Sequence, residues 1–163
     1  MEVVHKALKL LIIMGLLVVP LASWTDPVQQ AYKLVAEGQD ALNQGKTSKA
    51  EMAFRTALGL FPGWYKPMLG MAVVVMQRGE APEAAVKWAK KAVVLEPDRW
   101  EAHLILARVL EAADRAETAV LHYVKAFQLA GSHRDMVRDF ACPMMVRLKK
   151  FSDARTIGCV FKN

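Results

Sequence analysis

Cysteine is scarce in this chain of 163 residues, which contains only Cys142 and Cys159 and has no CxxC or CxxCH pattern. Two cysteines are too few for a disulfide-dense scaffold, and they allow at most one bridge, which forms only in an oxidising compartment. Charged residues are also few, at 23% against 54% hydrophobic residues. This composition excludes a disordered chain, and the length fits a single domain of ordinary size.

Sequence motifs that carry catalysis are missing as well. The chain has no GxSxG, GxxxxGKS/T, GxGxxG or HExxH pattern. No two histidines are spaced i, i+4, and no group of His, Cys and Asp has metal-ligand spacing. The histidines are His5, His103, His122 and His133. We therefore expect no enzyme, catalytic residue, metal, cofactor or small-molecule substrate; a dispersed triad, which leaves no motif, is the alternative.

Acidic residues are outnumbered by basic ones, 16 to 22, which gives a net charge of +6 and a pI near 9.4. Such a balance suits nucleic acid or an anionic membrane surface. However, the basic residues are dispersed, and the longest clusters are Lys90-Lys91 and Lys149-Lys150. An ordinary solvated surface is therefore favoured, and no nucleic acid is expected. A basic domain that touches nucleic acid is the alternative.

Charge is absent from the 13 residues Leu10–Ala22. This run is shorter than the roughly 20 apolar residues of a comfortable membrane-spanning helix, and it matches the core of a signal peptide. Neither Ala22 nor Ser23 completes the small-x-small pattern of a cleavage site, because Pro20 and Leu21 stand two residues before them.

An uncleaved anchor fits the flanking residues better. Lys9 can extend its amine to the membrane surface and Trp24 can lie among the headgroups, so that residues 7–24 span a thin bilayer. Lys6 and Lys9 then favour a cytoplasmic N-terminus and export of the rest. We expect residues 1–24 to be a signal anchor, with a cleaved signal peptide or a buried core helix as alternatives.

A repeated helical pattern occupies most of the remaining chain, residues 25–163. A small residue is followed by an aromatic four positions later, a small residue three further, and a chain breaker five beyond. Full or partial copies begin at Ala50, Ala85, Ala119 and Ala154, which lie 35, 34 and 35 residues apart. A period of this length indicates a stack of helix pairs, each of which needs its neighbours to bury its faces.

Local signals place several helix ends. Thr25-Asp26-Pro27 is typical of a helix start, with a capping side chain followed by proline at the first helical position. Gly45 ends that helix, and a second helix is predicted at about residues 48–60. In the last unit a helix over residues 134–149 is predicted to kink or break at Pro143, before a short helix over residues 153–161.

The repeated residues resemble the tetratricopeptide repeat, a helix–turn–helix unit of about 34 residues. The resemblance implies an all-α superhelix of three repeats and a degenerate fourth, preceded by an N-terminal hydrophobic helix. The repeats would span about residues 31–64, 65–99, 100–133 and 134–161. Phe54, Tyr123 and Phe161 are expected to fill the space between one repeat and the next, and Trp88 to take part of that role in the second.

In the register of these repeats Cys142 takes the position of Ala107, where paired helices cross, and Cys159 lies on the partner helix. Two cysteines facing each other across such a crossing can meet the Cα separation of roughly 4.4–6.8 Å that a bridge requires. In an exported domain a disulfide would stabilise the last repeat by about 2–4 kcal/mol. Two buried thiols are the alternative.

The resemblance also implies that the first helix of each pair lines the inner surface, where a partner segment would bind. The positions predicted to face it are Tyr32, Gln39, Asn43, Val74, Gln77, Arg78, Arg108, Glu111 and Arg138. Arg78, Arg108 and Arg138 are spaced about one per repeat, which suggests a basic line for an acidic or C-terminal peptide; solvated arginines are the alternative. Glu111 and Asp139 look like lone surface acids.

Some tetratricopeptide domains hold the C-terminal carboxylates of chaperones with a Lys/Asn clamp. The matching positions here are Val35, Gln39, Gly70, Leu104 and Arg108, which do not support that partner. The implied function is a non-catalytic protein–protein interaction module that binds a partner segment and supports assembly of a membrane or envelope complex. Anchored arrays of this type are similar to bacterial accessory factors of cytochrome c maturation, secretion and pilus assembly, which suggests the inner membrane and periplasm. A permanent structural subunit of a membrane complex is the alternative.

Overall fold

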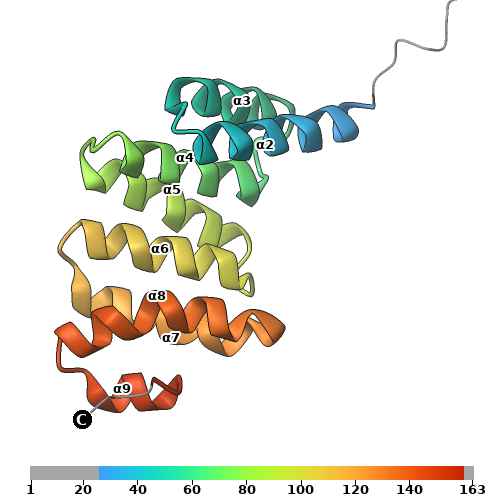
Figure 1. Ribbon diagram of the computed structural model, residues 1–163. Helices are drawn as coiled ribbons and strands as arrows, with labels where there is room; N and C mark the ends of the chain where they lie inside the picture. The colour runs from blue at the N-terminus through green and yellow to red at the C-terminus, as the bar shows by residue number, and fades with distance from the viewer. Residues whose placement is uncertain (1–25, 160–163) are drawn as a thin grey trace, which may run out of the picture.

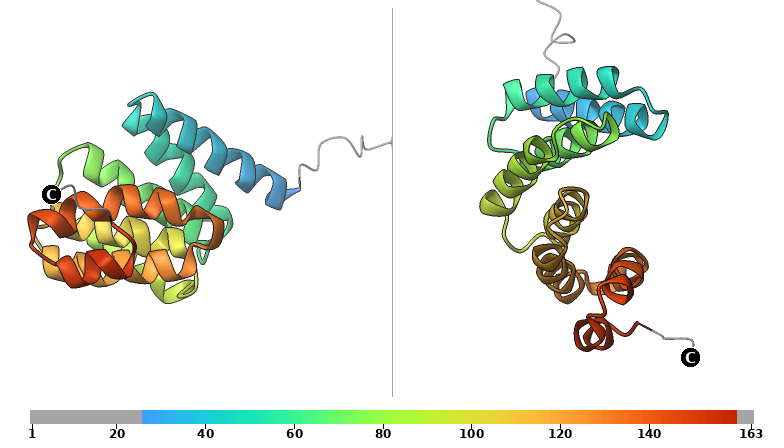
Figure 2. Two further views of the ribbon diagram at one scale, coloured as in Figure 1. Left: turned by 60° about the horizontal axis from the view of Figure 1, so that its bottom comes forward. Right: turned by 90° about the vertical axis from the view of Figure 1, so that its left-hand side faces the viewer.

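The computed structural model describes residues 26–159, so the predicted anchor at residues 1–24 and the predicted role of Phe161 lie outside it. Every regular element within that range is helical, and the helices form antiparallel pairs stacked into an array that turns along its length (Figures 1 and 2). The pairs are α2 (Pro27–Asn43) with α3 (Thr47–Leu60), α4 (Tyr65–Gln77) with α5 (Pro82–Leu95), α6 (Trp100–Ala112) with α7 (Ala116–Leu129), and, after the short 3-10 helix η2 (Gly131–His133), α8 (Arg134–Arg147) with α9 (Phe151–Thr156).

The predicted all-α array of helix pairs is therefore confirmed. Among residues 26–159 there is no helix with the length and apolar character needed to cross a membrane.

Helix starts and ends follow from local chemistry. The Asp26 side chain accepts a hydrogen bond from the Val28 amide at 2.9 Å, and Pro27 occupies the first helical position, as predicted. Gly45 and Gly79 follow the first helices of the first two pairs with φ of 70° and 65°, a left-handed conformation that glycine adopts without strain.

The same left-handed turn recurs in the third and fourth pairs without glycine. Asp114 has φ of 57° after α6, and Lys149 has φ of 55° after α8. A side chain in this region costs conformational energy, less for Asp than for most residues. The turn geometry is thus a property of the array, which imposes it on residues that do not favour it.

Small side chains lie where the paired helices cross. The members of the repeated pattern at these positions are at most 1% exposed; they are Ala50, Ala57, Ala85, Ala92, Ala119 and Ala126. Such residues let the helix backbones approach closely, and an added methylene group at these sites would force them apart.

Phe54 packs between the first repeat and the second. Its ring lies so close to Gly38 and Gly70 that a Cβ atom added at Gly70 would come within 2.4 Å of the ring. The predicted role of Phe54 is confirmed. In the second repeat Ala89 stands at the aromatic position, and the half-buried Trp88 packs against the core on both sides, as expected.

The last pair departs from the sequence prediction in two ways. The helix α8 continues through Pro143, where a kink or break was predicted. Proline has no amide hydrogen, so Pro143 leaves the carbonyl of Asp139 without its helical donor. Both residues are exposed, so water can satisfy that carbonyl. Moreover, α9 begins at Phe151 and has only six residues, because the chain turns at Gly158 with φ of 75°.

Candidate functional site

The first helices α2, α4 and α6 lie side by side and enclose an open groove of about 440 Å³. Its floor is apolar, because α2 contributes Val35 and Ala36, α4 contributes Leu69 and Val73, and α6 contributes Ile105. This surface, which we call the inner groove, spans three successive helix pairs. An open surface that crosses three helices suits an extended or helical segment.

Polar side chains line the same groove. They are Tyr32 and Gln39 on α2, Tyr65 and Lys66 on α4, and Glu101 on α6. Burial, followed by the nearby Glu101 carboxylate, raises the pKa of Tyr65. The Oε2 atom of Glu101 is buried and has no hydrogen-bond partner within residues 26–159. A buried carboxylate oxygen without a donor is costly, so Glu101 is an energetically unfavourable part of the groove in the free chain.

The structure brings two of the sequence-predicted residues together in this groove. Tyr32 is 57% exposed, and its ring packs edge-on against Trp64 at a centroid distance of 4.8 Å. The Gln39 amide donates a hydrogen bond to Asn43 Oδ1 at 3.3 Å, so these two side chains hold each other on the surface of α2. Their role in binding a partner stays a prediction.

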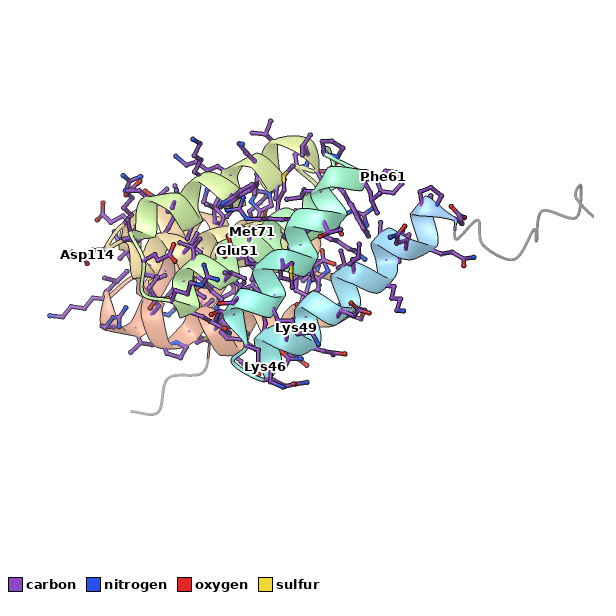
Figure 3. The ribbon with its side chains drawn as sticks, turned by 90° about the horizontal axis from the view of Figure 1, so that it is seen from above. Lys46, Lys49, Glu51, Phe61, Met71 and Asp114 are labelled. Atoms are coloured by element: carbon purple, nitrogen blue, oxygen red, sulfur yellow. A yellow bond between two sulfur atoms is a disulfide. The ribbon has the colours of Figure 1, made fainter. Side chains whose placement is uncertain are left out.

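The predicted arginine line is not part of the groove lining. Arg78 lies at the C-terminal cap of α4, beside the exposed Gln77, and its Nη1 atom is 2.6 Å from Glu51 Oε2 on α3. Figure 3 looks onto α3, with Lys46 and Phe61 at its two ends and Glu51 between them. Hydrogen bonds from Arg55, and then from Arg78, lower the pKa of Glu51. Arg78 thus joins the first two helix pairs.

The other two arginines also have partners, Arg108 across to α8 and Arg138 within α8. The guanidinium of Arg108 lies 4.7 Å from the ring centre of Phe140, and Arg138 pairs with Asp135 on α8. The three arginines therefore have three different partners and none of them lines the inner groove, and their role as a basic line for a peptide stays a prediction. Val74, which was predicted to face the inner surface, is instead fully buried in the core between the first two pairs.

Glu111 is not the lone surface acid that its sequence context suggests. Its Oε2 atom accepts a hydrogen bond from the Tyr123 hydroxyl at 3.0 Å, and its Oε1 atom accepts one from Arg147 at 2.8 Å. Burial, followed by the Glu111 carboxylate, raises the pKa of Tyr123. Glu111 connects α6 to both α7 and α8, which neither residue spacing nor composition indicates.

Comparison with known proteins identifies this architecture. Residues 35–95 match the family model described as Tetratricopeptide repeat. The Sgt2 TPR domain from Aspergillus fumigatus superposes with a TM-score of 0.67 at 21% identity, covering 75% of this chain and 81% of that one. The fold is that of the tetratricopeptide repeat.

Two further solved structures share the tetratricopeptide fold. The pilF protein of Pseudomonas aeruginosa has a TM-score of 0.71 at 20% identity, covering 80% of this chain and 59% of that one. The TPR2B domain of yeast Sti1, in a pHsp70 complex, has a TM-score of 0.64 at 15% identity, covering 72% of this chain and 98% of that one. No curated protein matches the sequence. The inner groove accordingly lies on the first helices of three tetratricopeptide hairpins.

A histidine pair lies within the third tetratricopeptide hairpin, and the sequence does not predict it. The Nδ1 atoms of His103 on α6 and His122 on α7 are 3.0 Å apart, and His103 Nε2 lies 2.9 Å from the Pro97 carbonyl oxygen. His103 therefore donates to Pro97, and His122 donates to His103. Burial, followed by His103 and then Lys90, lowers the pKa of His122. The two residues belong to different helices, so only the pairing of those helices could reveal them.

The fourth hairpin carries the disulfide that the repeat register suggested. Cys142 on α8 is joined to Cys159, just after α9, with their Cα atoms 5.6 Å apart. As for metal sites, the part of the chain seen in the structure contains no cluster of three or more His, Cys, Asp or Glu side chains that could hold an ion.

Proposed function

We propose that this chain is a non-catalytic tetratricopeptide protein that holds a segment of a partner protein in its inner groove. The observation that carries the proposal is the groove itself, in which an apolar floor from three helices is bordered by Tyr32, Gln39, Lys66 and Glu101. Apolar floors bind side chains, and bordering polar groups set the direction and register of a bound segment.

The chemistry of the groove argues against the chaperone-tail partner named for the yeast Sti1 domain. The places of the Lys/Asn clamp hold Val35, Gln39, Gly70, Leu104 and Arg108. Lys66 is the cation among the lining residues, whereas Glu101 brings a carboxylate with one buried, unpartnered oxygen. A segment ending in carboxylates would meet that negative charge, so an internal segment or one with a basic side chain fits better.

We further propose that the protein acts in the assembly of a membrane or envelope complex, held by residues 7–24 at a bacterial inner membrane with the repeats in the periplasm. The uncharged run Leu10–Ala22 precedes α2 closely, and the disulfide between Cys142 and Cys159 suits an oxidising compartment. The resemblance of the fold to pilF of Pseudomonas aeruginosa is in keeping with this setting.

A site-specific cross-linking experiment tests the binding site. A photoreactive amino acid at Ala36, an exposed residue that lines the inner groove, should capture a partner protein in the native host. The same amino acid at Thr118, an exposed residue of α7 outside the groove, should not. A partner trapped at Thr118 and not at Ala36 would contradict the proposal.

Purification of the protein from the same cells distinguishes an adaptor from a permanent subunit and tests the membrane tether. Ala36→Arg should abolish co-purification of the trapped partner in detergent, whereas Thr118→Arg should leave it unchanged. A partner that stays bound in fixed stoichiometry through extensive washing would indicate the alternative, a permanent structural subunit.

Sequencing the mature N-terminus would decide between an anchor and a cleaved signal peptide.

A further inference from the structure

A second groove, of about 620 Å³, runs along α5. Its lining extends along the helix from Glu83 to Leu95 and includes Met68 on α4 and the turn Pro62-Gly63 that joins the first pair to the second. We call this surface the α5 groove. No residue lines both it and the inner groove. A partner seated here would therefore leave the proposed peptide site open.

The floor and one end of the α5 groove are apolar. Met68 and Val86 are buried at its base, and Val94 and Leu95 stand at the end next to Pro62. Val94 is 80% exposed, more than any other large hydrophobic side chain in the described range, and Leu95 is 45% exposed. Single exposed apolar residues are ordinary, but two beside a recessed apolar floor form a contiguous apolar patch, whose exposure to water is unfavourable.

Three lysines border the same groove. Lys87, Lys90 and Lys91 are spaced i, i+3 and i+4, which places their like charges on one face of α5. No ion pair within residues 26–159 involves any of them. The acid at the other end of the groove, Glu83, is 2.9 Å from Arg115. The free chain thus leaves these three neighbouring lysines without a carboxylate partner in the described range, and the Lys91 amine lies over the Trp88 ring, 5.1 Å from its centre.

We propose that the α5 groove binds an acidic amphipathic segment of a partner protein. Its carboxylates would pair with Lys87, Lys90 and Lys91, and its apolar side chains would cover Val94 and Leu95. Binding would offset both features that are unfavourable in the free chain, the like-charge repulsion and the exposed valine. Positions where a sequence departs from the best local choice are often functional.

The observations favour a protein segment over two other occupants. The flat surface of an anionic bilayer could reach the lysines but not the recessed base formed by Met68 and Val86. The N-terminal residues 1–24 of this chain carry Lys6 and Lys9 against the single acid Glu2, so their charge does not complement that of the lysines.

Calorimetric titration of the whole chain with a synthetic peptide tests the proposal. The probe is an amidated 14-residue helix with leucine on one face, flanked by glutamate, and its matched control has glutamine in place of every glutamate. We expect the glutamate peptide to bind at least tenfold more tightly than the glutamine peptide at low salt. The difference should shrink as salt is raised.

Two charge-matched variants locate the binding. Lys90→Glu/Lys91→Glu should weaken binding of the glutamate peptide at least tenfold, whereas Lys46→Glu/Lys49→Glu, at exposed lysines around the start of α3, should bind as the parent chain does. Val94→Ser, at a site too exposed to affect folding, should weaken binding several-fold with an unchanged melting temperature.

Several results would overturn the proposal. They are no binding of the glutamate peptide, equal binding of the glutamine peptide, or equal loss in the two charge variants. Binding to phosphatidylglycerol vesicles, but not to the peptide, through Lys90 and Lys91 would assign the surface to anionic lipid instead. None of these results bears on the inner groove, because its lining contains none of the substituted residues.

Discussion

Phe54 lies between two glycines whose lack of a side chain is a packing requirement. A Cβ atom at Gly38 would be 2.6 Å from the ring, and one at Gly70 would be 2.4 Å away. Because the ring is held on both sides, it cannot move away from either. At Gly59 on α3, by contrast, an added Cβ would meet nothing within 4 Å. Replacement by alanine should therefore have opposite effects on the free energy of unfolding at Gly70 and at Gly59.

We predict that Gly70→Ala lowers the free energy of unfolding by about 1–3 kcal/mol through overpacking. Gly59→Ala should raise it by about 0.5–1 kcal/mol, because alanine in a helix loses less conformational entropy than glycine on folding. Urea unfolding followed by circular dichroism measures both. Similar destabilisation at both sites would show that the Phe54 contact does not control the packing.

His122 should make stability depend on pH. Its pKa is lowered in the folded protein by burial, followed by His103 and Lys90, and that of an unfolded histidine is about 6.5. As the pH falls below about 6.5 the unfolded chain takes up a proton before the folded chain does. The free energy of unfolding should therefore decrease, until the pH is below the folded pKa as well.

The measurement compares urea unfolding of the parent chain and of His122→Gln at pH 7.5 and pH 5.5. The substitution should reduce the loss of stability between the two pH values. His133→Gln, at an exposed histidine, is the control and should leave that loss in place. An unchanged loss in His122→Gln would assign the pH dependence to other groups.

At the scale of the elements, Glu111 joins three helices through two contacts of different kinds. The Tyr123 hydroxyl that donates to it belongs to a side chain that is 1% exposed, whereas the Arg147 side chain that pairs with it is 66% exposed. Hydrogen bonds from buried groups to charged partners contribute more than ion pairs in water do. The contact within the third hairpin should therefore stabilise the array more than the contact to α8.

Tyr123→Phe tests this ranking, because it removes the hydroxyl and keeps the ring. We predict a loss of about 1–3 kcal/mol in the free energy of unfolding. Arg147→Ala should cost less than about 1 kcal/mol. Chemical denaturation of both variants at neutral pH provides the comparison, and a larger loss for Arg147→Ala would reverse the ranking.

The sequence predicts some elements of the fold better than others. The spacing of small residues and chain breakers predicted the helix pairs, because Ala50 and its counterparts must be small wherever two helices cross. The turns at Asp114 and Lys149 were less visible, since no glycine marks their left-handed backbone. Pro143 misled the prediction for α8 because the sequence cannot show that Asp139 and Pro143 both lie on the exposed face of the helix.

The candidate site was predictable only in part, for a related reason. Helical register identified Tyr32 and Gln39 as exposed on a first helix, and both line the inner groove. It could not foresee that Arg78 would pair with Glu51, since that partner lies on another helix. Glu101 was missed because one acid in the first turn of a helix resembles an ordinary favourable charge at a helix start.

At the scale of the whole molecule, stability should be distributed along the array. Each helix pair contacts mainly its neighbours, and the six-residue α9 lies mainly against α8 and α7. In a stack of this kind the terminal unit has one neighbour instead of two, so it opens first. The bridge between Cys142 and Cys159, 17 residues apart, closes a loop around this weakest unit.

Reduction of the bridge should therefore release the end of the array and leave the rest folded. In the chain-entropy model, a closed loop of this length stabilises the folded state by about 3 kcal/mol. Hydrogen exchange followed by mass spectrometry should show faster exchange of α8 and α9 after reduction, with α2 to α7 unchanged. Cys142→Ser without reductant should reproduce the pattern of the reduced parent chain, and reductant should have no further effect on it. Equal exchange of the parent chain with and without reductant would instead indicate two packed thiols, since only a covalent link makes the last pair sensitive to redox state.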